Sequence, residues 1–176
     1  MILEKTMELH GNYNHPITAK KRIYSSKEDL WNLISKPGYL NLVHPFCKQN
    51  NVISWKSSNH SDELIYHNNL KFIRDFIKWN EKNGYELVIG EKNKKKSLVK
   101  WKISLVNNKT YLSITVYPYL MNQYPKIISF LPYLIYIKPM LKSYLNSVLS
   151  GINWYLKTKK PVSKNQFGKH KWFLKI

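Results

Sequence analysis

Hydrophobic and polar positions alternate with two different periods along the chain, and the longest helical pattern comes last. Between Pro139 and Lys157 apolar residues recur every three or four positions and form one continuous stripe, made by Leu141, Leu145, Val148, Ile152 and Tyr155 or Leu156. Proline suits the first turn of a helix, because the N–H that it lacks would have no partner there. Gly151 lies in mid-helix, where glycine costs about 1 kcal/mol relative to alanine. We therefore expect another part of the chain to approach the helix backbone closely at this position.

The preceding sequence predicts one strand, two short helices and six further strands. The first strand runs from His15 to Tyr24. Ser26 and Asp29 then form a pattern close to a capping box at the start of a helix, and a second short helix ends at His44. From there the period falls to two, which predicts strands at Val52–Lys56, Asp62–Asn68, Lys71–Trp79, Tyr85–Ile89, Ser97–Val106 and Tyr111–Tyr119. Because short turns join consecutive strands, we predict an antiparallel sheet in a single α+β domain.

The charge of the chain is strongly basic, with 29 lysines and arginines against 10 acidic residues and a formal net charge of +19. Such a balance can serve nucleic acid or an anionic membrane surface. However, the chain is rich in Lys, Asn, Ile and Tyr and has two arginines, Arg22 and Arg74, a composition that an AT-rich genome produces without functional demand. Arginine is the main bidentate reader of bases and phosphates. We therefore do not expect nucleic acid to be the partner.

The sequence predicts a soluble, cytoplasmic protein. The first ten residues include Glu4 and Glu8 and lack the apolar core of a signal peptide. No stretch reaches the roughly 18–20 apolar residues of a membrane span, and the nearest one, Ile127–Ile137, contains Pro132. The single cysteine, Cys47, rules out an intrachain disulfide and is typical of a reducing compartment. We interpret it as a small apolar residue rather than a reactive thiol.

The order of elements, with a tryptophan in the first short helix and a long amphipathic helix at the end, resembles the START-like or SRPBCC (helix-grip) superfamily. It is most similar to the polyketide cyclase/dehydrase-like branch. The resemblance covers about residues 15–173 and rests on Lys27–Ser35, Pro37-Gly38, Trp79, Gly84–Leu87, Tyr144–Gly151 and Asn165–Phe173. It implies a seven-stranded antiparallel sheet wrapped around the C-terminal helix, with a cavity for hydrophobic ligands between them. It carries over no catalytic residue, because the superfamily shares none.

Three parts of the chain follow from this assignment. We expect a lead-in over residues 1–14, the helix-grip domain over 15–159 and a C-terminal tail over 160–176 that packs on the domain. Aromatic residues of the tail, Phe167, Trp172 and Phe173, are expected to hold it there.

Alternation within the strands places aromatic side chains on the concave face of the sheet, opposite the long helix. Mixed tryptophan and tyrosine form an apolar wall with a few hydrogen-bonding tips, which suits a flat or elongated ligand. The predicted ligand-binding residues are Trp55, Tyr66, Trp79, Trp101, Ile103, Tyr117 and Tyr119 from the strands and Tyr144 from the helix. The alternative interpretation is that these rings fill the core.

Two polar residues complete the predicted site. Arg74 lies in an otherwise apolar strand, where it either meets a carboxylate, phosphate or carbonyl of a ligand or pairs with a cross-strand carboxylate such as Asp62 or Glu86. His44 is either a gate or acid–base group at the cavity, or a capping or surface residue. The other histidines lack ligand-like spacing, and no HExxH, CxxC or glycine-rich phosphate motif is present. We expect no metal and no cofactor.

The segment Tyr124–Ile137 carries more apolar residues than one helical face can bury. It is either a lid over the cavity or a membrane-contacting segment, which together with lysine-rich turns would suit transient contact with an anionic bilayer. The alternative is a broken helix that packs over one end of the sheet.

Three functions are compatible with these features. The first, which we favour, is binding, transport or sequestration of a hydrophobic small molecule or lipid. The second is an enzyme of the polyketide cyclase or aromatase type, with its acid–base group among Arg74, His44, Asp62 and Tyr66. The third is a basic surface module for an anionic membrane or nucleic acid. The residues leave open whether any catalysis occurs, although no GxSxG elbow or Cys–His pair supports a nucleophilic enzyme.

Overall fold

The structure is a computed structural model, and it describes residues 15–56, 59–119 and 131–173. Strand β1 (Ile17–Ile23) is followed by helices α2 (Lys27–Ile34) and α3 (Leu40–Val43). Six strands come next: β2 (Cys47–Lys56), β3 (Asn59–Tyr66), β4 (Lys71–Asn80), β5 (Gly84–Gly90), β6 (Ser97–Val106) and β7 (Lys109–Tyr117). A π-helical turn, η1 (Tyr133–Ile137), runs into the long helix α5 (Lys138–Thr158), and the tail ends in a 3-10 turn, η2 (Lys171–Phe173). The expected lead-in and residues 124–130 of the apolar segment lie outside the described residues.

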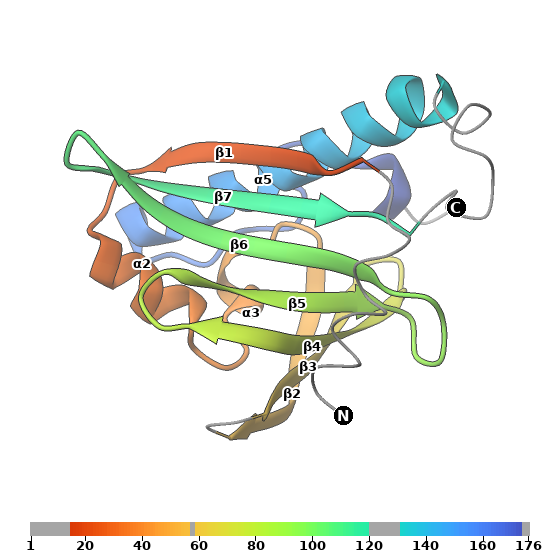
Figure 1. The fold of residues 1–176 in the computed structure, drawn as a ribbon, viewed down its shortest axis with the longest axis horizontal. Coiled ribbons are helices and arrows are strands. Elements are labelled where there is room, and N and C mark those ends of the chain that lie inside the picture. Colours follow the sequence, from red (N-terminus) through yellow and green to blue (C-terminus); the bar gives the residue numbers. More distant parts are fainter. Residues whose placement is uncertain (1–14, 57–58, 120–130, 174–176) are drawn as a thin grey trace.

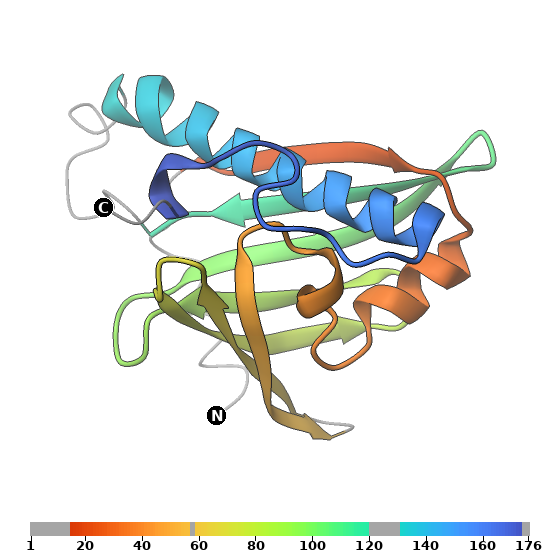
Figure 2. The same ribbon diagram turned by 180° about the vertical axis from the view of Figure 1, so that it is seen from behind.

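The strands form one antiparallel sheet in the order β1-β7-β6-β5-β4-β3-β2. The sheet lies in front of α5 in Figure 1, and Figure 2 shows the helix crossing its concave side, with β1 along one flank and α3 and β2 along the other. This arrangement confirms the prediction of an α+β helix-grip fold with a seven-stranded sheet.

The predicted boundaries are least accurate at β2 and β3. β2 begins at Cys47 rather than Val52, and β3 begins at Asn59 rather than Asp62. Pairing continues to Trp55 with His60 and Lys56 with Asn59. Polar residues occupy both faces of much of these strands, so they lack the apolar alternation that marks a half-buried strand.

Helix α2 begins as its sequence predicts. The Ser26 hydroxyl oxygen accepts a hydrogen bond from the Asp29 backbone N–H at 2.9 Å, and the hydroxyl donates to the Asp29 carboxylate at 2.7 Å. The apolar side of this helix is buried and includes Trp31, whose ring meets Trp79 of β4 edge-on with centroids 5.3 Å apart. The helix therefore closes one end of the core.

Helix α5 places its apolar stripe against the sheet, where Leu141, Leu145, Val148, Leu149, Ile152 and Leu156 are buried. Its close approach to another backbone is confirmed at Gly151: a Cβ atom there would lie 1.9 Å from the Val43 carbonyl oxygen of α3. The tail continues this contact, because the Val162 N–H donates to the Leu42 carbonyl at 2.9 Å. In the described ranges no helix, α5 included, has the length and hydropathy of a membrane span.

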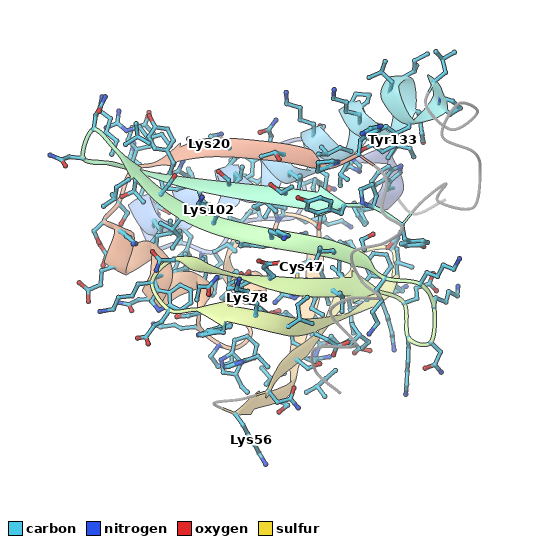
Figure 3. The ribbon with its side chains drawn as sticks, in the orientation of Figure 1. Lys20, Cys47, Lys56, Lys78, Lys102 and Tyr133 are labelled. Carbon is cyan, nitrogen blue, oxygen red and sulfur yellow. The ribbon has the colours of Figure 1, made fainter. Side chains whose placement is uncertain are left out.

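The outer face of the sheet is basic. Figure 3 labels Lys20 of β1, Lys102 of β6 and Lys78 of β4 on the side turned away from α5. Glu86 of β5 lies among them, with its carboxylate 3.0 Å from the Lys100 ammonium and 3.9 Å from that of Lys78. The concave side of the same strands is mainly apolar, with Arg74 of β4 as a charged exception, so the sheet separates a basic surface from the core.

We predict that Gly151→Ala destabilises the protein, although alanine is normally the better helix former by about 1 kcal/mol. The added methyl group would overlap the Val43 carbonyl, so α3 must move, and we expect the free energy of unfolding to fall by about 1–3 kcal/mol in urea denaturation. Asn146→Ala, an exposed position of the same helix, is the matched control and should change stability by less than about 0.5 kcal/mol. A more stable Gly151→Ala protein would contradict the close contact.

Candidate functional site

A cavity of about 280 Å³ lies between the concave face of the sheet and α5. This volume is near the lower end of the range for small-molecule pockets, roughly 300–1,000 Å³. Its walls are mainly aliphatic and come from the sheet and from α5, with Leu64, Leu87, Val99, Ile114 and Val116 on the strands and Leu141, Leu145 and Val148 on the helix. The lining also includes Pro118 and Tyr119, which follow β7, and the tail residues Trp172 and Phe173.

Six of the ten sequence-predicted site residues line this cavity: His44, Tyr66, Arg74, Trp101, Tyr119 and Tyr144. They come from the end of α3, from β3, β4 and β6, from the residues after β7, and from α5. The tertiary fold therefore brings together residues that are distant in sequence. Whether they contact a ligand stays a prediction. His44 ends α3 as expected, but its side chain is buried, with 5% of its surface exposed, so it is not a surface histidine.

Four predicted residues lie elsewhere. Trp55 and Trp79 belong to an aromatic cluster near α2, where the Trp79 ring stacks on His60 at 4.2 Å. Ile103 is buried in the core beyond the cavity wall. Tyr117 alternates with the buried Val116 and so faces outward, with the Lys100 ammonium 5.7 Å from its ring centroid. The assignment of Tyr117 to the concave face was therefore wrong. For Trp55, Trp79 and Ile103, alternation could not show where along the concave face the cavity ends.

Sequence reasoning also missed much of the wall. Val99 and Leu87 occupy the same face as Trp101, so alternation could have identified them. Trp172 and Phe173 were expected to hold the tail on the domain, and nothing in their spacing showed that they would also line the cavity.

The tail is held against the cavity by stacking and by hydrogen bonds. The Phe173 ring stacks on Tyr66 with centroids 4.2 Å apart. Asn68 donates to the Trp172 carbonyl at 3.0 Å, and the His170 side chain hydrogen-bonds the Met140 carbonyl of α5 at 3.0 Å through Nε2. Because Phe173 and Trp172 both line the cavity, the tail forms part of its boundary.

Arg74 and Asp62 form a buried ion pair between β4 and β3. The guanidinium donates from Nε to Oδ1 at 2.7 Å and from Nη2 to Oδ2 at 2.5 Å, and the two residues are 3% and 0% exposed. Nη1 also lies 3.4 Å from the Tyr39 hydroxyl, which hydrogen-bonds the Tyr85 hydroxyl at 2.6 Å. The sequence left open whether Arg74 pairs with a cross-strand carboxylate or meets a ligand. The structure shows the pair with Asp62 and also places Arg74 in the lining of the cavity.

The surroundings of Arg74 keep its guanidinium charged. Burial alone would lower the pKa of the Arg74 guanidinium, but the Asp62 carboxylate outweighs this effect and holds the pKa well above its usual range. Both Asp62 oxygens are occupied by Arg74, so this carboxylate is engaged in structure rather than poised as a free general base.

A second polar group joins α3, β3 and α5. His44 Nε2 lies 2.8 Å from the Tyr144 hydroxyl, which in turn lies 3.0 Å from the Tyr66 hydroxyl. On the other side of the imidazole, Nδ1 accepts a hydrogen bond from the Phe46 backbone N–H at 3.2 Å. Burial, assisted by the charge of Arg74, lowers the pKa of His44 to about 3, so the ring is neutral near pH 7.

The described part of the chain shows neither a reactive thiol nor a group of metal ligands. Cys47 is half-buried, and burial raises the pKa of its thiol to about 12, so it is protonated at neutral pH and is a poor nucleophile. Among residues 15–56, 59–119 and 131–173, no group of three His, Cys, Asp or Glu side chains is arranged to hold a metal ion.

Comparison with known proteins gives matches of structure. No protein-family model matches the sequence, and no curated protein matches it. DynU16, a protein of the dynemicin biosynthetic locus, superposes with a TM-score of 0.64 at 11% identity over 86% of this chain and 52% of its own, so the chain spans about half of DynU16. A START superfamily protein from Mycobacterium smegmatis gives 0.62 at 11% identity over 84% of this chain and 100% of its own. Aha1 from Colwellia psychrerythraea gives 0.59 at 10% identity over 82% and 98%.

These similarities show that the chain has a START-like, SRPBCC-type fold. At 10–11% identity they concern the fold alone. Ligand and chemistry must therefore be argued from this chain's own cavity.

We predict that breaking the buried ion pair is costly, whereas replacing it is not. Asp62→Ala would leave the Arg74 charge buried without a partner and should lower the free energy of unfolding by about 3–5 kcal/mol. The apolar double variant Asp62→Leu/Arg74→Met should recover most of that loss in the same denaturation experiment. Glu86→Gln, which disrupts pairs on the outer face, serves as the control and should cost less than about 1 kcal/mol. An Asp62→Ala protein as stable as the control would contradict this view of the pair.

Proposed function

We propose that this protein binds a hydrophobic small molecule or lipid in the cavity between the sheet and α5, and that it transports or sequesters the molecule. The observation that carries the proposal is an aliphatic cavity of about 280 Å³ with polar groups at a few defined places: Arg74, the His44–Tyr144–Tyr66 group and Ser97. Burial of apolar ligand surface supplies the affinity, at about 25 cal/mol per Å², and the polar groups orient the ligand. The START-like fold supports this assignment by analogy.

The enzymatic alternative, a polyketide cyclase-like activity, would draw on the same cavity. Its best acid–base candidates are His44 and the tyrosine that it contacts, Tyr144. Two features favour binding over catalysis. The pKa of His44 is lowered to about 3, far from the neutral range that suits a general base, and Asp62 is held by Arg74.

The test is to identify what the cavity holds and to fill the cavity. Native mass spectrometry of the purified protein, followed by organic extraction, should find a stoichiometric apolar molecule. Val116→Trp would place an indole in the cavity and should reduce the amount bound by at least about tenfold, because the two cannot occupy one space. Thr115→Trp is the matched control, since the neighbouring residue faces outward, and it should leave occupancy unchanged.

An equal amount of bound molecule in the two tryptophan variants would overturn the cavity as the binding site. The two variants differ in the face of β7 that carries the new tryptophan. Ser113 and Thr115 lie on the outer face of the sheet, whereas Ile114 and Val116 are buried on the concave face. Circular dichroism of both variants shows whether each is folded.

We further propose that the protein takes up its ligand at an anionic bilayer, through the start of the long helix. Figure 1 shows this end of the helix extending past β1. Leu131, Leu134, Ile135 and Tyr136 expose 41–68% of their surface there, and we call them the apolar end patch. Lys138 and Lys142 are exposed beside it, and no acidic residue follows Glu91 in the sequence. Apolar side chains beside lysines suit the interface of a bilayer with negative headgroups.

Replacement of the apolar end patch should weaken membrane binding while leaving the cavity intact. Leu134→Glu/Ile135→Glu is expected to reduce co-sedimentation with phosphatidylserine-containing vesicles by at least about fivefold, through loss of apolar contact and charge repulsion. Ile53→Glu, at an equally exposed apolar position on β2, is the control and should bind as the parent does. Undiminished binding of the double variant, or equal binding to neutral vesicles, would contradict the proposal.

A further inference from the structure

The hydrogen atoms of the His44–Tyr144–Tyr66 group can be counted from its contacts. Nδ1 of His44 accepts from the Phe46 N–H, so in the neutral ring the proton is on Nε2. Nε2–H must then donate to the Tyr144 hydroxyl oxygen, 2.8 Å away. Burial raises the pKa values of Tyr66 and Tyr144, so both hydroxyls keep their hydrogens.

The group therefore has three donor hydrogens and two hydrogen bonds. One bond is used by His44, and the 3.0 Å contact between the tyrosine hydroxyls uses the hydrogen of one of them. The hydrogen of the other hydroxyl is left without an acceptor, since neither oxygen makes a further hydrogen bond to the described residues. Whether Tyr66 or Tyr144 holds it, both residues line the cavity. A buried donor without an acceptor is costly, so a molecule that brings an acceptor oxygen to this hydrogen gains a hydrogen bond there.

The other polar groups of the wall also present donors. A guanidinium has five N–H groups and no acceptor, and the contacts of Arg74 to Asp62 and Tyr39 use three of the five. Ser97 Oγ already accepts from the Tyr119 N–H at 3.2 Å. No carboxylate is among the residues that line the cavity in the described structure. The wall is therefore suited to oxygen acceptors and unsuited to a cationic amine.

We propose that the bound molecule carries an acceptor oxygen, foremost a carbonyl, which receives the unused tyrosine hydrogen at the His44–Tyr144–Tyr66 group. This inference rests on the proposed function and narrows it to apolar molecules with a carbonyl or a similar acceptor. His44 acts here as a positioning residue, because its Nε2–H occupies the Tyr144 oxygen and directs the hydroxyl hydrogens away from itself.

The test compares probes that differ in one group. Fluorenone and fluorene share a rigid three-ring skeleton and differ by a carbonyl in place of a methylene group; 2-undecanone and undecane form a flexible pair. In equilibrium dialysis we expect the ketone of the better-binding pair to bind at least about fivefold more tightly than its hydrocarbon. The infrared carbonyl band of the bound ketone should lie at lower wavenumber than in an alkane solvent, as hydrogen bonding requires.

Variants then assign the donor. Tyr66→Phe/Tyr144→Phe should reduce the preference for the ketone to below about twofold and return the carbonyl band toward its alkane position, while the hydrocarbon still binds. Tyr111→Phe removes a hydroxyl from β7 outside the cavity lining and should change neither. A preference and band shift that persist in the double variant would overturn the assignment to these hydroxyls.

The outcomes separate this inference from the function beneath it. Equal binding of ketone and hydrocarbon to the unmodified protein, with an unshifted carbonyl band, would overturn the inference and leave hydrophobic binding in place. Failure of both probe pairs to bind would contradict the cavity function itself and this inference with it. The comparison and the infrared band use the unmodified protein, so they decide the question even if the double variant does not fold.

Discussion

The contact between Gly151 of α5 and the Val43 carbonyl of α3 is the constraint on which the rest of the structure depends. It allows the two helices to approach without a side chain between them. The end of α3 is thereby held beside α5, and His44 reaches Tyr144 from there. The tail uses the same surface, since Val162 bonds Leu42, and it then returns along α5 to the cavity (Figure 2). A glycine in mid-helix thus sets the spacing on which the polar part of the site relies.

The cavity combines an aliphatic wall with polar groups that are satisfied to different degrees. Both oxygens of the Asp62 carboxylate accept hydrogen bonds from Arg74, and both residues are buried. Pairs of this kind contribute little net stability compared with apolar residues of the same shape, but they make loss of one partner expensive. The tyrosines beside His44 differ, because their donors exceed the acceptors around them. Polar groups that the protein does not satisfy itself are the part of a cavity most informative about its ligand.

The sequence determined the architecture well, because the elements carry local signals. The stripe of α5, the Ser26 cap and the clean alternation of β6 each follow from residue spacing, and the helix-grip order of elements followed from them. Gly151 was identified from its cost in a helix alone. The boundaries of β2 and β3 escaped prediction because polar residues occupy both of their faces.

The composition of the cavity was decided by the tertiary structure. Alternation indicates the face of the sheet on which a residue lies, but not how far along the strand the cavity extends. Trp79 and Trp101 share the concave face, yet of these two only Trp101 lines the cavity. Arg74 could pair or point into the cavity, and the register of β3 with β4 made it do both. His44, Tyr66 and Tyr144 are distant in sequence, and Phe173 joins them from the tail. Their meeting depends on packing between elements, which no local pattern of residues encodes.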